Sequence, residues 1–309
     1  MSYEGQMLEN LRMPSKAEVE THLLKALLRH RGVLKEFASG VEIVDELADE
    51  FDLDQQQRSA TLERIYRKEN RIVHSLLWHR LLFRAADSLA KSSLVSRPTA
   101  TLQLSGKREW MLTEKGFDQA LLIEGKQDLK KEDLGVRSYE VQKVVKKIVT
   151  TPRPVDYNPV ESSKKLVLKT SSSYFRSRGF RQAVIEAYDC KCAFCGFKLS
   201  SPDSLAWEVQ AAHIVPNTMQ GKDDVWNGLA LCGIHHWAFD VGWLTLNHKH
   251  FVEVSNRINS LPSSIGKIGS VDLLRMFAMN STRMFMPADQ NLFPHETAIA
   301  WHRINRFIP

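Results

Sequence analysis

The 309-residue sequence contains no long apolar run, since none approaches the ~20 consecutive apolar residues that a membrane-spanning helix requires. The segment at its start, MSYEGQMLENLRMPSK, lacks the continuous apolar stretch of a signal peptide. Internal repeats and low-complexity segments are also missing. These absences argue against a membrane protein and a repeat protein, and they favour a cytoplasmic location.

Cysteine is absent from the first 189 residues, and all four cysteines lie between Cys190 and Cys232. A disulfide framework would distribute its cysteines along the chain, whereas a tight cluster in an intracellular protein is typical of a metal site. The distribution therefore predicts a metal site in the second half of the chain.

The composition is that of an ordinary globular protein, with 43% hydrophobic and 25% charged residues. The length exceeds that of one typical domain, so we expect two. A formal net charge of +6 and a pI of about 9.1 favour polyanionic partners, above all nucleic acid. The charge alone does not decide this, because many basic proteins never bind DNA.

The first part of the chain predicts one compact unit. Apolar residues at helical spacing predict segments over 13–30, 40–54 and 59–95, the last as one long helix or two abutting helices. Alternation around Ser105 and Gly106 predicts a β-hairpin, and a short helix follows at 116–123. Three helices followed by a two-stranded wing is the order of a winged helix, so we expect such a domain over residues 14–125.

A change in composition separates this unit from the rest. Residues 126–172 are rich in charge and proline and predict a linker, with one amphipathic helix at 136–149. A second domain is expected over 173–309. It begins with a basic amphipathic helix at 174–189 and ends with a helix at 297–309.

Two half-sites with the same two-residue gap predict a structural zinc site. Their residues are Cys192 and Cys195 in the first, and Cys232 and His235 in the second. Each gap lets one tight turn present two ligands, and two turns complete a tetrahedron around Zn²⁺. The alternative is a set of buried small residues beside a surface histidine. Cys190 is expected to be a free thiol. A closed site of this kind would hold the domain together rather than catalyse.

The segment 207–244 between and after these half-sites resembles the HNH, or ββα-metal, nuclease family. The motifs are A-H-I-x-P and N-G-L-x-L-C-x-x-H-H-x-x-F-D, and the likeness covers roughly residues 174–245. The resemblance implies that His213 is the general base and that Asn227 orients its imidazole or gives an oxygen to a metal. It also implies that His236 binds a catalytic Mg²⁺ or Mn²⁺ together with Asp240, one helical turn later. A cap or a salt-bridge partner is the alternative for Asp240.

One position departs from that pattern. Many HNH enzymes have an acidic or histidine metal ligand directly before the base, and Ala212 stands there in this chain. Glu208 and Gln210 are nearby at alternate strand positions. The metal would then be held by His236, Asn227 and Asp240.

The first unit resembles the winged-helix domain of Mrr-type restriction proteins over residues 14–125. The resemblance implies a recognition helix within 77–91 and a wing tip that reach DNA, through Arg80, Arg84, Ser88, Lys91, Lys107 and Arg108. Three arginines of the second domain could contact phosphates: Arg176, Arg178 and Arg181. For every one of these residues a solvated charged face is the alternative.

The combined expectation is an α+β protein in which a winged-helix domain is joined by a charged linker to a zinc-stabilised HNH domain. The implied activity is restriction of double-stranded DNA, directed to modified bases by the winged helix. Two alternatives stay open. One is a restriction enzyme for an unmodified palindrome, which would act as a homodimer. The other is a DNA-binding regulator with an inactive HNH domain, which the alanine at position 212 motivates.

Overall fold

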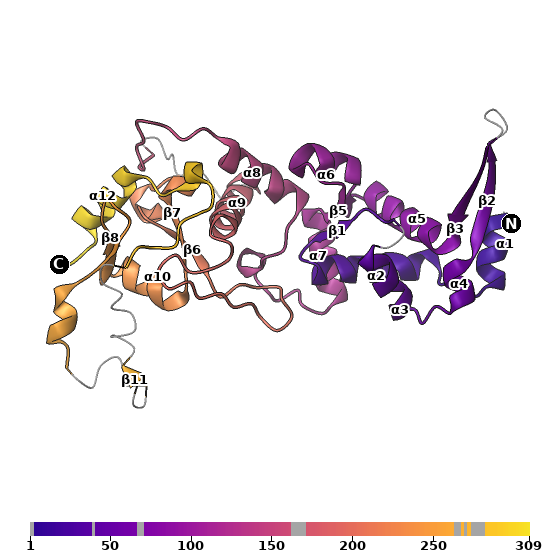
Figure 1. Cartoon of the computed structure of the whole chain (residues 1–309), viewed down its shortest axis with the longest axis horizontal. Helices are drawn as coiled ribbons and strands as arrows, with labels where there is room; N and C mark the ends of the chain where they lie inside the picture. Colours follow the sequence, from indigo (N-terminus) through magenta and orange to yellow (C-terminus); the bar gives the residue numbers. More distant parts are fainter. Residues whose placement is uncertain are drawn as a thin grey trace. The chain divides into compact units, whose positions relative to one another are not determined.

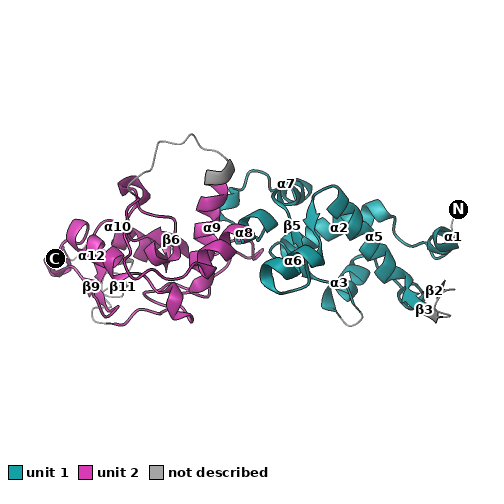
Figure 2. Ribbon diagram, turned by 90° about the horizontal axis from the view of Figure 1, so that it is seen from above, with its two compact units in different colours: residues 1–142 teal, residues 143–309 magenta. Residues whose placement is uncertain are grey.

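The computed structural model describes residues 3–38, 41–66, 71–161, 171–262, 267–268, 271–272 and 282–309. The chain divides into two compact units, residues 1–142 and 143–309 (Figure 2). The division falls inside the stretch expected to be a linker. That stretch holds the predicted amphipathic helix as α8 (Tyr139–Thr150), whose Val141 and Val145 are buried. In the described part of the chain, no helix has the length and apolar content needed to cross a membrane.

In the first unit, helices surround a small antiparallel sheet (Figure 1). Its elements are α1 (Tyr3–Asn10), α2 (Lys16–Arg29), β1 (Val33–Lys35), α3 (Glu42–Glu50), α4 (Gln55–Ser59), β2 (Thr61–Tyr66), β3 (Arg71–Leu76), α5 (Leu77–Lys91), β4 (Val95–Ser96), α6 (Pro98–Ser105), β5 (Glu109–Leu112), α7 (Glu114–Ile123) and η1 (Lys131–Asp133). The sheet has the order β1-β5-β4, with Leu34 opposite Trp110. A capping box between Ser15 and Glu18 begins α2, which packs against α5 and α7.

The predicted helix over 77–91 is confirmed as α5, and its burial explains why it forms. Seven residues at three- and four-residue steps are buried: Leu77, Trp78, Leu81, Leu82, Ala85, Ala86 and Leu89. Burying one leucine side chain stabilises the fold by roughly 1.5–3 kcal/mol, so this stripe anchors α5 in the unit.

Two expectations for the first unit are wrong. The helical segment predicted from residue 59 begins instead with the β2–β3 hairpin, in which Ile65 faces Ile72. β-Branched residues favour a strand at such positions, which overrides the weak helical spacing. The β-hairpin predicted around Ser105 and Gly106 does not form there, because these two residues end helix α6. Pro98 starts that helix, and Gly106 terminates it with a left-handed φ of 73°.

The second unit contains a ββα arrangement between flanking helices (Figure 1). Its elements are α9 (Ser171–Ala187), β6 (Gln210–His213), η2 (Asn217–Met219), η3 (Val225–Asn227), β7 (Gly228–Leu231), α10 (Gly233–Asp240), β8 (Leu244–Leu246), β9 (Val252–Val254), η4 (Asn256–Ser260), β10 (Lys267–Ile268), β11 (Val271–Asp272), η5 (Gln290–Leu292) and α12 (Glu296–Asn305). Strand β6 pairs antiparallel with β7, and α10 packs against both. The predicted C-terminal helix is confirmed as α12, which packs against β8.

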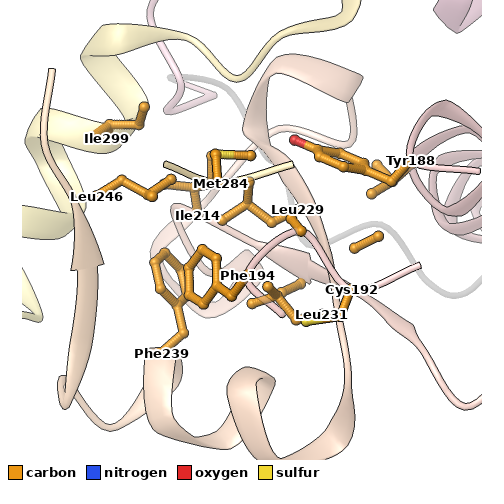
Figure 3. Close-up of a cluster of buried hydrophobic side chains, with 14 of the residues drawn as sticks. Tyr188, Cys192, Phe194, Ile214, Leu229, Leu231, Phe239, Leu246, Met284 and Ile299 are labelled. Carbon is orange, nitrogen blue, oxygen red and sulfur yellow. The ribbon is translucent and has the colours of Figure 1, made fainter. Parts of the chain in front are cut away.

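The core of the second unit joins these elements around one set of buried side chains. Phe194, Leu231 and Phe239 lie together beneath the ββα arrangement, and Met284 and Ile299 reach the same cluster from the C-terminal segment (Figure 3). Helix α9 packs on β6 and β7 from another side. A Cβ at Gly228 would come within 2.4 Å of Val184, so the close approach of β7 to α9 requires glycine there.

Candidate active site and metal centre

The four residues predicted to bind zinc come together. The ligand atoms of Cys192, Cys195, Cys232 and His235 all lie within 4.8 Å of one another. Nδ1 of His235 is 3.0 Å from Sγ of Cys232 and 3.6 Å from Sγ of Cys192. A tetrahedron with Zn–S bonds of ~2.3 Å has edges of ~3.8 Å, which is close to these separations. Three sulfurs and one imidazole nitrogen are the donor set of a closed structural zinc site.

Local backbone structure presents each ligand pair. The amide of Gly196 donates to the carbonyl of Cys192 at 2.8 Å, and Gly196 adopts a φ of 74°. This turn brings Cys192 and Cys195 to the same side. Cys232 is the N-cap of α10, and His235 lies in the first turn of that helix. A metal ion bound by these four residues would therefore tie the Cys192–Cys195 turn to the start of the helix that follows β7.

The electrostatics of the four residues favour a cation. Hydrogen bonds with the Cys195 and Cys232 thiols hold the pKa of the Cys192 thiol below its ordinary value. Burial alone lowers the pKa of His235, but its hydrogen bonds to Cys192 and Cys195 outweigh burial and raise that pKa to about 9. The hydrogen bonds to Cys192 and Cys195 raise the pKa of the Cys232 thiol in turn, so the first negative charge lies on the Cys192 sulfur, and a divalent metal ion would replace the remaining protons. Cys190 lies outside this group.

His213 lies at the end of β6 in a defined orientation. Its ring stacks on Phe180 of α9, with centroids 4.1 Å apart. Its Nε2 is 2.9 Å from Oδ1 of Asp223, and the Nε of Arg176 is 3.7 Å from the other oxygen of that carboxylate. A carboxylate can only accept, so Nε2 carries the proton and Nδ1 has the free lone pair.

Asp223 is a functional residue that the sequence analysis missed. It lies in the loop between β6 and η3, ten positions after His213, and its side chain is only 10% exposed. The only feature of the sequence that could have indicated Asp223 is its position in the loop that follows β6. A carboxylate between two antiparallel strands can fold back on the residue that ends the first strand.

The side chain of Asn227 binds backbone groups of the loop after β6. Its side chain is fully buried, accepts from the amide of Val215 at 2.8 Å, and donates to the carbonyls of Val215 and Lys222 at 3.0 Å each. These bonds use both amide protons and one oxygen lone pair. Asn227 therefore holds the backbone of the loop that carries Asp223, and the His213 ring is not among these hydrogen-bond partners.

His236 and Asp240 form the other half of the site on α10. Nδ1 of His236 is 2.8 Å from Oε1 of Gln210, and its Nε2 is 3.4 Å from the carboxylate of Asp240. Because an amide oxygen only accepts, the proton is on Nδ1, and the lone pair of Nε2 points towards Asp240. A metal ion could bind both groups. In the ranges that the structure describes, only the zinc cluster brings three or more such ligands together, so such an ion would keep water ligands.

Interacting charges link the two halves of this site. Burial lowers the pKa of His236, and the nearby His213 and Arg181 lower it further, against the effect of Asp240. Burial raises the pKa of Asp240, while His236, Arg306 and His213 oppose that rise. His236 is therefore neutral near pH 7, the form in which imidazole binds a metal.

The residues at and before position 212, where the family pattern has a metal ligand, contribute to the fold. Ala212 is fully buried and pairs with Leu229 in the strand register. Glu208 accepts from the amide of Gly233 at 2.9 Å and so caps the start of α10. Gln210, at the start of β6, also reaches the site through its contact with His236.

The three arginines of α9 differ in their surroundings. Arg176 is exposed beside Asp223, and Arg181 is half-buried near His236. Arg178 is only 4% exposed and lies over the Tyr174 ring at 5.8 Å. The expectation that Arg178 contacts DNA phosphates is therefore wrong, because its position on the helix turns it inward.

The residues predicted to contact DNA from the first unit lie on α5 and after α6. Arg80 and Arg84 bind Glu4 of α1, and only Arg84 is largely exposed. Ser88 accepts from Lys16, and Lys91 pairs with Asp87. Lys107 and Arg108 follow the end of α6 rather than a hairpin tip, and Arg108 binds Glu36 at 2.8 Å.

Comparisons with known proteins give a family match for part of the second unit and a likeness to a solved structure. Residues 192–247 match the family model described as HNH endonuclease, so the chain contains an HNH endonuclease domain there. A solved structure titled "Modification dependent TagI restriction endonuclease" is similar with a TM-score of 0.28 and 20% identity, over 40% of this chain and 36% of that one. The chain thus spans about a third of that protein's length. No curated protein matches the chain.

Proposed function

We propose that the chain is a restriction-type endonuclease that hydrolyses phosphodiester bonds of double-stranded DNA at the site formed by β6, the following loop and α10. The observation that carries this proposal is the His213–Asp223 pair beside His236 and Asp240, inside the segment that matches the HNH endonuclease family. A base and a metal-binding pair within one site are the groups that phosphodiester hydrolysis needs.

His213 acts as the general base. Its Nδ1 accepts a proton from the water that attacks phosphorus, while Nε2–H stays bound to Asp223. The carboxylate stabilises the imidazolium that forms, and stacking on Phe180 keeps the ring in position. Arg176, beside Asp223, is placed to bind a phosphate oxygen of the strand being cut.

His236 and Asp240 hold the catalytic Mg²⁺ or Mn²⁺ in this proposal. When bound, the ion neutralises the charge that develops on the phosphate and the leaving oxygen. Gln210 fixes the tautomer of His236, so that Nε2 rather than Nδ1 is the ligand atom. The zinc cluster holds the start of α10 in place and takes no part in the reaction.

The first unit is proposed to be a winged-helix reader that directs cleavage to modified DNA. The sheet order β1-β5-β4, with α2, α3 and α5 distributed as in a winged helix, supports this. Helix α6 would then take the place of the first wing. That the first unit selects modified bases is a more specific proposal, which rests on the resemblance to Mrr-type restriction proteins.

A panel of substrates tests the proposal. The full chain is incubated with Mg²⁺ or Mn²⁺ and with DNAs that carry methylated, hydroxymethylated or unmodified bases. We expect cutting of modified DNA only, and none by a His213→Ala variant. Equal cutting of all DNAs at one sequence would favour the enzyme for an unmodified palindrome. No cutting, with unchanged DNA binding by His213→Ala, would favour the regulator that Ala212 suggests.

A further inference from the structure

The first unit contains a pocket that the proposed nuclease chemistry does not use. It has a volume of about 650 Å³ and lies between α5, the start of α6 and β5. Phe83, Ser88 and Trp110 are among its lining residues. Pockets of ~300–1,000 Å³ are typical of sites for small organic ligands, so this one can take a nucleotide.

Aromatic rings form one wall of this pocket. Phe83 and Trp110 are T-shaped at 6.4 Å, and both contact Phe37, which stacks on Trp110 at 5.8 Å. Trp110 is 4% exposed, and its indole Nε1–H has no hydrogen-bond acceptor among the described residues. Phe83 is 36% exposed, although the apolar stripe of α5 is otherwise buried. An exposed phenyl face on a polar rim is suited to stacking on a planar ring.

The rim of the pocket is strongly charged. Five cations line it, with two carboxylates between them: Lys16, Arg84, Lys91, Arg97 and Arg108, and Glu36 and Asp87. Asp87 accepts from Arg97 at 2.7 Å and pairs with Lys91 at 2.9 Å. Arg108 pairs with Glu36, and Arg84 and Lys16 pair with Glu4 and Glu20 outside the lining. These cations can exchange such partners for the phosphates of a ligand, while the carboxylates can accept from base amino groups.

We propose that this pocket binds a nucleobase turned out of the DNA helix, which stacks on Phe83 while the rim cations hold the adjoining phosphates. This inference rests on the proposed function, because it names the site at which the first unit reads DNA. A groove for the phosphate backbone alone would need the cations but not an exposed aromatic wall. An enzyme that turns a base out of the duplex reads it by stacking and by hydrogen bonds to its edge, so the fit of the base in such a pocket can make binding selective.

Binding assays with the full chain can test this proposal separately from cleavage. The His213→Ala background removes cutting, and duplexes carry 5-methylcytosine, 5-hydroxymethylcytosine, N6-methyladenine or no modification. A 2-aminopurine placed directly 3′ to the test base reports loss of stacking by increased fluorescence. Affinity is measured by anisotropy for the parent, Phe83→Ala, Phe83→Tyr and the control Leu122→Ala, whose side chain is exposed on α7 outside the pocket.

We expect the parent to prefer one modified duplex and to increase its 2-aminopurine emission. Phe83→Ala should lower affinity for that duplex about tenfold or more and leave the unmodified duplex unaffected, because stacking is worth ~1–3 kcal/mol per base. Phe83→Tyr should restore binding, and Leu122→Ala should change nothing. Equal affinity for all duplexes, an equal loss on modified and unmodified DNA, or unchanged emission would each overturn the proposal. Failure of the nuclease proposal would appear instead as absent cleavage by the chain with His213 intact, while selective binding persists.

Discussion

Asp223 lies 2.9 Å from Nε2 of His213, and in the proposed mechanism its negative charge stabilises the imidazolium. Asp223→Asn keeps an acceptor of similar size but removes that charge. We expect the cleavage rate to fall about 10- to 100-fold, the range typical of residues that orient another residue of the site by a hydrogen bond. Initial rates of plasmid nicking measure this. Asp189→Asn, at an exposed carboxylate paired with Lys198, is the matched control and should cut normally. A full rate in Asp223→Asn would contradict the role of Asp223.

Asn227 binds the backbone of the loop after β6, so we expect it to contribute mainly to the stability of that loop. Asn227→Asp would place a carboxylate oxygen against the carbonyls of Val215 and Lys222, where the amide now donates at 3.0 Å. Because the group is fully buried, we expect the free energy of unfolding of the second unit to fall by about 3 kcal/mol or more. Urea unfolding measures this, with the exposed Asn256→Asp as control. Equal stability of the two variants would argue against this role.

The site residues that could be predicted from the sequence are those that are brought together by one turn or by the start of one helix. Cys192 and Cys195 share one turn, and Cys232 and His235 share the start of one helix, so the spacing alone pairs them. Asp223 reaches His213 across a loop, and no spacing rule predicts that contact. The inward position of Arg178 depends on how α9 is rotated against its neighbours, which the basic character of the segment does not reveal.

At the scale of elements, segments with a strong N-cap or a continuous apolar stripe were predictable. α2 and α5 satisfy both local propensity and burial, and so does α12. Residues 59–76 lack such a stripe, and their β-branched residues pair across β2 and β3 instead. The alternation before Gly106 resembled a strand, but Pro98 and Gly106 define a helix of eight residues.

Helix α12 is held by a buried histidine whose neutrality matters for stability. His302 stacks on Phe239 at 3.7 Å, while its ring nitrogens contact Thr245 and the carbonyl of Phe239. Burial lowers its pKa from 6.5 to about 4, and Arg306 contributes to the decrease. As pH falls below 6.5, the unfolded chain therefore binds this proton before the folded protein does. The stabilisation is complete above that pH and is lost progressively down to about pH 4.

We expect His302 to contribute about 3 kcal/mol to the pH dependence of unfolding, since one pKa unit corresponds to about 1.4 kcal/mol. Thermal or urea unfolding between pH 4 and 7 measures this in the parent and in His302→Gln, which keeps a donor and an acceptor but does not titrate. The variant should lose less stability on acidification than the parent. Other histidines with lowered pKa values, such as His250, titrate in both proteins and cancel in the difference. Parallel pH profiles would refute the assignment.

At the scale of the whole molecule, the two units have separate sources of stability. The first unit, residues 1–142, has no cysteine and depends on its apolar core, of which the α5 stripe is a part. The second unit combines its core with the metal centre, where Cys192 and Phe194 belong to the same buried cluster (Figure 3). Loss of zinc should therefore act on one unit and spare the other.

Calorimetry of the full chain can separate these contributions. With zinc bound we expect transitions from both units, and a chelator such as 1,10-phenanthroline should remove or strongly lower only the transition of the second unit. Cys192→Ser should reproduce this loss without a chelator, because it removes one of four ligands. Cys190→Ser is the matched control, two positions away and outside the ligand group, and should unfold like the parent. DNA cutting should disappear with the same transition, because the start of α10 and hence His236 depend on the centre. A chelator-treated protein that keeps both transitions would show that the four residues do not hold a structural metal.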